Sequence, residues 1–211
     1  MTTNTLYPIF LKLDKINTLI VGGGNIGLEK LNFILTQSPR ANIKIVSPEF
    51  HPEIILKAIA NTNIQLVERK FVDSDIANIK ILILATNNLA LNTQIYFKAQ
   101  EKNILTNVVD KPEYCDFYTG AVLQKGNIKI GISSNGVSPT VAKRLKEILI
   151  DVIPENISES TVRLNKIRTH LKGNLTLKIK ILNQLTEVLV DDIHHQNSQN
   201  KTSILQQINW N

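Results

Sequence analysis

The sequence contains very little cysteine. Cys115 is the single cysteine among 211 residues, so an internal disulfide framework is excluded. No apolar run approaches the roughly 18 residues that a membrane-spanning helix needs. The first residues also lack the basic start and apolar core of a secretory signal peptide. These absences favour a cytoplasmic protein with no membrane segment.

Aromatic residues are scarce as well, at 5% of the chain. Nucleic-acid binding by base stacking depends on such side chains, and no recognition-helix motif is present. The formal net charge of +6 would suit phosphates, a polycarboxylate ligand or nucleic acid, so charge alone keeps a nucleic-acid-binding protein as one alternative. The four histidines show no metal-ligand spacing, and His194 and His195 would point about 100° apart on a helix. We therefore expect no resident metal and no nucleic-acid partner.

A glycine-rich turn between a predicted strand and a predicted helix is the main motif. Thr18 to Val21 is a short apolar run typical of a strand, and leucine and isoleucine recur at helical spacing after the turn. Gly22, Gly24 and Gly27 match G-x-G-x-x-G, in which they allow a tight turn, approach of a pyrophosphate and close helix packing, respectively. The helix would offer free N–H groups to phosphates. The motif predicts a dinucleotide site; the alternative is a glycine turn that binds nothing.

Strands and helices alternate through the first half of the chain. The pattern predicts helices after the glycine turn and at 52–60 and 89–102, and strands at 9–13, 18–21, 43–46, 64–68, 79–85 and 104–109. Ile79 to Ala85 is almost continuously apolar, as expected of a strand buried on both faces. This alternation predicts an α/β fold with a Rossmann-type, doubly wound parallel sheet.

The pattern changes after residue 113. A strand pair is predicted at 121–124 and 128–133, followed by a helix that begins at Ser138-Pro139 and ends by Pro154. Only helical patterns follow, with a break at Gly173-Asn174. We therefore expect a Rossmann domain at 1–113, a small α+β segment at 114–153, and a helical C-terminal domain at 154–211 with a frayed tail from Gln196.

Four segments should meet beyond the carboxyl ends of the parallel strands, where open α/β sheets bind ligands. The predicted cofactor-binding residues come from these segments: Gly22, Gly24, Asn25, Ile26, Gly27, Ser47, Pro48, Thr86 and Asn107. Ser47 stands where many dinucleotide sites carry an acidic residue, and Glu49 follows two positions later. No arginine replaces that acid, which favours NAD over its 2′-phosphorylated form.

Two further residues are candidates for contact with a substrate. Asp110 follows an apolar strand at the same edge, where a carboxylate can accept a proton; the alternative is a turn aspartate before Pro112. Ser138 precedes a helix, and its alternative is a plain helix cap. The basic residues Lys143 and Arg144 lie a few positions further on.

Together these segments resemble the precorrin-2 dehydrogenase family, the dehydrogenase and ferrochelatase module of siroheme synthases. The motifs that carry the resemblance follow one another in the family's order: Tyr7-Pro8-Ile9-Phe10-Leu11, the Val-Gly-Gly-Gly turn with Lys30 after it, Ala85-Thr86-Asn87, Asn107-Val108-Val109-Asp110, Cys115-Asp116-Phe117 and Ser133-Ser134-Asn135-Gly136-Val137-Ser138-Pro139. The chain departs from the family's pattern at Gly27, where alanine is frequent, and at Gly120, where proline is common.

The resemblance implies NAD-dependent oxidation of precorrin-2 to sirohydrochlorin, in some members followed by insertion of Fe²⁺ to give siroheme. It implies a homodimer built through 114–153. The family's key aspartate corresponds to Asp110 and its serine to Ser138. Lys143 and Arg144 would suit a substrate that carries eight carboxylates. The alternative is a non-enzymatic NAD-sensing regulatory domain, which leaves Asp110 without a task.

Overall fold

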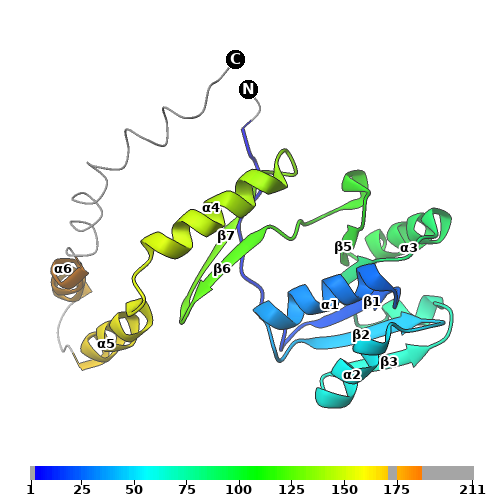
Figure 1. Ribbon diagram of the computed structural model, residues 1–211, viewed down its shortest axis with the longest axis horizontal. Helices are drawn as coiled ribbons and strands as arrows, with labels where there is room; N and C mark the ends of the chain where they lie inside the picture. The colour runs from blue at the N-terminus through cyan, green and yellow to red at the C-terminus, as the bar shows by residue number, and fades with distance from the viewer. Residues whose placement is uncertain (1–2, 171–174, 187–211) are drawn as a thin grey trace. The chain divides into compact units, whose positions relative to one another are not determined.

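The computed structural model describes residues 3–170 and 175–186 (Figure 1). Their contacts form two compact units, one from Met1–Ala121 with Ser133–Ala142 and one from Val122–Ile132 with Lys143–Asn211. The three-part division predicted at residues 113 and 153 stays a prediction. The predicted tail from Gln196, the break at 173–174 and the histidines His194 and His195 lie outside the described residues.

The first unit contains a five-stranded, fully parallel sheet. Its strands are β1 (Asn17–Val21), β2 (Asn42–Ser47), β3 (Ile64–Glu68), β4 (Ile81–Leu84) and β5 (Leu105–Val108). They lie in the order β3-β2-β1-β4-β5, so the chain winds outward from β1 in both directions. The prediction of a doubly wound α/β fold is confirmed.

The helices of this unit cover both faces of the sheet. They are α1 (Asn25–Gln37), α2 (Pro52–Ala60) and α3 (Leu89–Gln100), with short 3-10 turns η1 (Asp73–Ile76) and η2 (Pro112–Tyr114) that the sequence patterns had not indicated. Successive residues of a strand point to opposite faces. Ile20 accordingly packs with Leu31 of α1 and Ile54 of α2, whereas Leu19 packs with Ile95 of α3. The sheet is thus buried on both sides.

The crossover from β3 to β4 contains η1 where a longer helix could have run. Asp75 of η1 is 2% exposed. Its carboxylate accepts two hydrogen bonds from Arg69, at 2.7 and 2.9 Å, and one from Lys44 of β2 at 2.5 Å. The Arg69 guanidinium, helped by Lys44, holds the pKa of the Asp75 carboxyl well below its usual range. This ion-pair network fastens the crossover to the sheet.

Asp75→Asn should lower the free energy of unfolding by about 2 kcal/mol at pH 7. Breaking a fully buried ion pair costs roughly 3–5 kcal/mol. The loss should be smaller here because Arg69 and Lys44 remain partly in contact with water. A lowered pKa stabilises the fold above pH ~4, and this contribution is lost as the pH falls further. Urea unfolding at pH 7 and pH 3 should therefore show a smaller difference between variant and wild type in acid. Asp73→Asn, in an exposed pair with Lys98, is the control and should have little effect. An equal loss in both variants would contradict this account.

One predicted strand is wrong. Residues 9–13 form no strand, and Ile9 and Phe10 are exposed. The end of the segment contacts the sheet, because Asn42 N donates to Leu13 O at 3.0 Å and the Leu13 side chain packs against the core. A short apolar run is compatible with an extended backbone, but a strand also requires an unpaired strand beside it. Strand β1, which follows the segment, is already paired on both sides, with β2 and with β4.

The segment after β5 also forms the predicted elements. Strands β6 (Ala121–Lys125) and β7 (Ile128–Ile132) make a two-stranded sheet, and α4 runs over Pro139–Val152. Lys125 Nζ donates to Ile150 O at 3.0 Å and to Ile153 O at 2.6 Å. A cation at the carboxyl end of a helix satisfies free carbonyls and complements the helix dipole. Lys125 therefore joins this hairpin to the end of α4.

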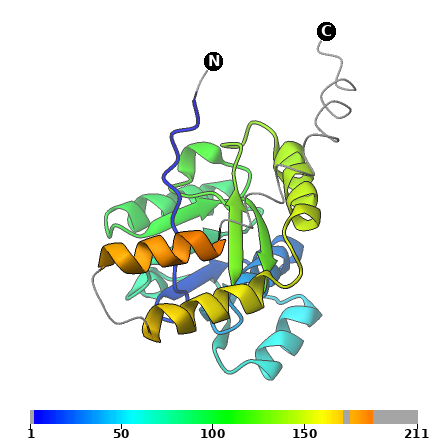
Figure 2. The same ribbon diagram turned by 90° about the vertical axis from the view of Figure 1, so that its left-hand side faces the viewer.

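Two helices complete the described part of the second unit. They are α5 (Ile157–His170) and α6 (Leu175–Thr186), which contact each other and lie side by side in Figure 2, in yellow and orange. Neither of them, nor any other helix in the described ranges, is long and apolar enough to cross a membrane.

Candidate functional site

The carboxyl ends of four neighbouring strands, β2, β1, β4 and β5, lie level with one another. Gly22 N donates to Val46 O at 2.9 Å, Ala85 N to Val21 O at 2.8 Å, and Val109 N to Leu84 O at 3.1 Å. The glycine turn, the end of β2, the Thr86 loop and the Asp110 turn therefore follow their strands at the same edge of the sheet, as expected. In an open α/β sheet this edge is where ligands bind.

The glycine turn has the geometry of a phosphate-binding loop. Gly22 has a φ of +116°, and a Cβ there would lie 2.4 Å from Ala85 O. A Cβ on Gly27 would lie 2.1 Å from Gly22 O, so an alanine at this position would require the loop to shift. A Cβ on Gly24, by contrast, would meet nothing within 4 Å. The chain is therefore packed tightly behind the loop and open in front of Gly24.

The helix that follows the turn begins without a side-chain cap from any described residue. Gly24 is the N-cap of α1, with no side-chain cap and no acidic residue in the first turn. The backbone N–H groups of that turn and the dipole behind them can accept an anion. A phosphate could come close to the backbone because Gly24 has no side chain. This half of the site fits the pyrophosphate of a dinucleotide.

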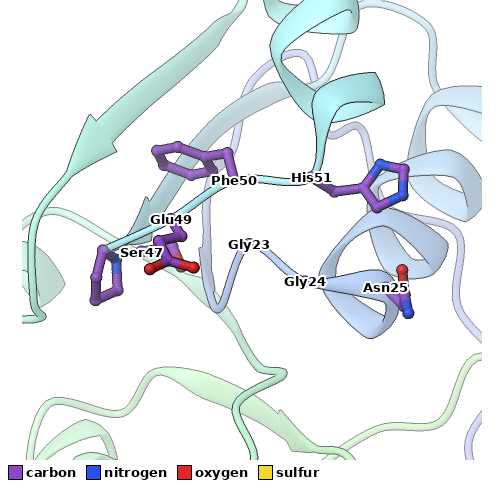
Figure 3. Close-up of a pocket in the computed structure, with 8 residues that line it drawn as sticks. Gly23, Gly24, Asn25, Ser47, Glu49, Phe50 and His51 are labelled. Atoms are coloured by element: carbon purple, nitrogen blue, oxygen red, sulfur yellow. The ribbon is translucent and has the colours of Figure 1, made fainter.

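A cavity of about 600 Å³ opens beside the turn (Figure 3). It is lined by residues 23–25 of the glycine loop and 47–51 of the β2–α2 loop. Four predicted cofactor residues are among them, namely Gly24, Asn25, Ser47 and Pro48. The predicted Ile26 and Thr86 are not part of its lining, and neither are Gly22, Gly27 and Asn107.

His51 was not predicted as a site residue, although it lines the cavity. Its backbone N donates to Gly23 O at 2.7 Å, which fastens the β2–α2 loop to the glycine turn. Its Nδ1 accepts from Glu53 N at 3.2 Å and caps α2. The neutral ring must then carry its proton on Nε2, so that a hydrogen-bond donor remains free. The proline at 52, which is favoured at the first position of a helix, was the sequence signal for this cap.

Thr86 belongs to a loop that a buried amide holds in place. Its Oγ1 donates to Asn92 Oδ1 at 2.6 Å, and Asn92 Nδ2 donates back to Thr86 O at 3.0 Å. Asn92 of α3 is 3% exposed and was not predicted. The Thr86 side chain thus shapes the loop beyond β4.

Asn107 and the Cys115-Asp116-Phe117 segment cover the edge strand β5. Asn107 Nδ2 donates to Phe117 O at 2.9 Å, and Asp116 exchanges bonds of 2.8 and 2.9 Å with the backbone of Thr106. Pairing of this kind protects an edge strand. Burial raises the pKa of the Cys115 thiol, which disfavours a reactive thiolate.

Asp110 lies in the turn directly after β5, with a φ of +60°. Lys111 N closes this turn onto Val108 O at 3.2 Å. The side chain is exposed and makes no hydrogen bond or ion pair with any residue in the described ranges. Aspartate tolerates the left-handed backbone, which accounts for the residue type at this turn. Its carboxylate remains available for a ligand.

Ser138 is the cap that its sequence position suggested. Its Oγ accepts from Val141 N at 3.3 Å, at the start of α4. Arg144 pairs with Glu147 at 2.6 Å on the same helix, and Lys143 is exposed. The substrate contacts predicted for these three residues stay predictions.

Comparison with known proteins places this site in a family. Residues 9–121 match the family model described as putative NAD(P)-binding, in agreement with the predicted cofactor. The siroheme synthase of Pseudoalteromonas translucida (strain TAC 125) is 34% identical over 165 residues, which are 78% of this chain and 34% of that protein. The siroheme synthase of Psychrobacter arcticus is 34% identical over 176 residues, which are 83% of this chain and 31% of that protein. The chain thus spans about a third of the length of these relatives.

A solved structure covers nearly the whole chain. The protein titled SirC, precorrin-2 dehydrogenase, matches with a TM-score of 0.70 and 25% identity. The match includes 96% of this chain and 98% of that one. The similarity therefore extends beyond the parallel sheet into the second unit.

Proposed function

The chain belongs to the NAD(P)-binding family whose model it matches, and on this premise, with its similarity to siroheme synthases and to a precorrin-2 dehydrogenase, we propose that it oxidises precorrin-2 to sirohydrochlorin with NAD as the oxidant. The observation that carries the proposal is the match to SirC over almost the full length of both chains, combined with an open glycine-loop cavity in this one. We also assign the cytoplasm as its compartment.

Each part of the cofactor site has a task in this reaction. The first turn of α1 and the bare Gly24 would hold the pyrophosphate, and residues 47–51 would hold the adenosine side. NAD supplies the hydride acceptor when it is bound. The protein's contribution is to fix the orientation of the dinucleotide beside the ends of β4 and β5.

We assign to Asp110 the handling of protons at the macrocycle. Oxidation removes a hydride and a proton, and the proton needs a base within reach. Asp110 is a carboxylate at the ligand-binding edge, with no partner among the described residues. Ser138, Lys143 and Arg144 are proposed to contact the carboxylates of the substrate, the last two by charge.

A second reaction, insertion of Fe²⁺ into sirohydrochlorin, is proposed for the same carboxylate. Metal entry releases the pyrrole N–H protons, which Asp110 could accept. No group of three or more His, Cys, Asp or Glu side chains suited to a metal occurs in the part of the chain that the structure describes. In this proposal Fe²⁺ is a substrate of the second reaction.

The proposal is tested by mixing the protein with precorrin-2 and NAD under anaerobic conditions. The absorbance of NADH should rise as sirohydrochlorin forms. Binding of NAD without any turnover would support the alternative, a non-enzymatic NAD-sensing regulator. Failure to bind either compound would contradict both functions.

We further propose a homodimer built through 114–153. Helix α4 carries an exposed apolar stripe at helical spacing, formed by Val141, Leu145, Ile148 and Val152, each 44–54% exposed. Such a continuous apolar face is typical of an interaction surface.

Light scattering should give about twice the chain mass of 23.7 kDa. Leu145→Lys should give a monomer, whereas Lys143→Glu, which leaves the stripe intact, should not; a monomeric wild type would contradict the dimer.

A further inference from the structure

We propose that Glu49 selects NAD against NADP by binding the adenosine ribose and repelling a 2′-phosphate. This inference rests on the proposed function only in taking the glycine-loop cavity as the dinucleotide site. It assigns a specificity role to a residue that follows the end of β2 by two positions.

The end of β2 cannot supply this selectivity itself. Ser47, the last residue of β2, is 8% exposed and carries no charge. A carboxylate at this place in many dinucleotide sites binds the ribose hydroxyl groups. The next residue, Pro48, has neither a side-chain polar group nor a backbone N–H. The ribose end of the cavity thus has one remaining charged side chain, that of Glu49.

The structure holds Glu49 in position through its backbone. The Glu49 carbonyl lies so close to the glycine turn that a Cβ on Gly23 would be 2.4 Å away from it. Two residues later, His51 N donates to Gly23 O at 2.7 Å. The loop that carries Glu49 is therefore bound to the phosphate-binding turn on one side and to α2 on the other. Its side chain lies beside Ser47 and the glycine turn in Figure 3.

The Glu49 carboxylate is available for a ligand. It is exposed and makes no hydrogen bond or ion pair with any residue between 3–170 or 175–186. Lysine and arginine are both absent from the described residues that line the cavity. The 2′-phosphate of NADP would be repelled by the Glu49 carboxylate, and no lysine or arginine in the described lining would offset this repulsion. The ribose hydroxyl groups of NAD would instead donate hydrogen bonds to the carboxylate.

The test is direct binding of NAD and NADP to the full chain, by calorimetry, without any tetrapyrrole. Wild type should prefer NAD. Glu49→Gln keeps the size of the side chain but removes the charge, so NAD affinity should fall about tenfold while NADP affinity stays the same or rises. Glu49→Arg should reverse the preference. Glu53→Gln, which makes the same charge change on the neighbouring helix outside the cavity lining, is the matched control and should leave both affinities unchanged.

Equal affinity of wild type for the two nucleotides, or an equal loss of both in Glu49→Gln, would overturn the inference. Failure of wild type to bind either nucleotide would overturn it together with the cofactor site. Selectivity that depends on Glu49 in a protein that does not oxidise precorrin-2 would uphold the inference and overturn the proposed reaction. The two conclusions can therefore fail separately.

Discussion

Asp110→Asn should reduce the rate of precorrin-2 oxidation by about 10²–10⁴-fold while NAD affinity stays the same, since a positioned acid–base group typically contributes this much. The substitution keeps the size of the side chain and removes its charge and its capacity to accept a proton. Asparagine suits the backbone φ of +60° at least as well as aspartate does. The carboxylate has no partner in the described part of the chain, so its removal should leave the fold intact. Stopped-flow measurement of NADH formation gives the rate.

The matched control is Glu113→Gln, which makes the same charge change in the same loop. Glu113 pairs only loosely with Lys111, at 3.8 Å, and should be dispensable. Assaying wild type and Asp110→Asn with sirohydrochlorin and Fe²⁺ or Co²⁺ tests metal insertion in the same way. If the variant oxidised precorrin-2 at the wild-type rate, Asp110 would be a turn residue only, and the proposed chemistry would lose its base.

Gly24→Asp should abolish NAD binding in a protein that is as stable as wild type or slightly more so. Position 24 has φ −83° and ψ −162°, which an L-residue adopts without strain, and a Cβ there meets nothing within 4 Å. Aspartate is also a favourable N-cap, worth roughly a few tenths of a kcal/mol relative to glycine. The same carboxylate would occupy the helix N-terminus that the pyrophosphate needs, and it would repel a second anion there.

Calorimetry with NAD and thermal unfolding together test this prediction. Gly24→Asn provides the control, because it has nearly the same shape and capping ability without the charge, and it should weaken NAD binding less than Gly24→Asp. Unchanged NAD affinity in Gly24→Asp would remove the glycine loop from the cofactor site. Loss of binding together with loss of stability would show that position 24 serves the fold and not the ligand.

Local patterns in the sequence determined most of the elements of this fold. Helix Pro52–Ala60 and strand Ile64–Glu68 have the bounds that the sequence pattern predicted. The glycine spacing likewise indicated a tight turn and close helix packing, which agree with the positive φ of Gly22 and the contact of Gly27, whereas the pyrophosphate contact of Gly24 stays a prediction. These features depend on a residue's own conformational range and on neighbours within a few positions, which a sequence displays directly.

The tertiary structure alone decided which distant groups meet. No local pattern shows that β2 and β4 occupy both sides of β1, next to residues 9–13, or that Asp75 reaches Lys44 on β2. A local pattern also does not show that Glu49 and His51 line the cavity. Nor does it show that the side chains of Thr86 and Asn107 instead form hydrogen bonds within neighbouring segments. Strand order and crossover path bring such residues together from positions up to tens of residues apart. The side-chain partners of a buried carboxylate or a cavity wall therefore depend on the whole sheet, and on no single stretch of it.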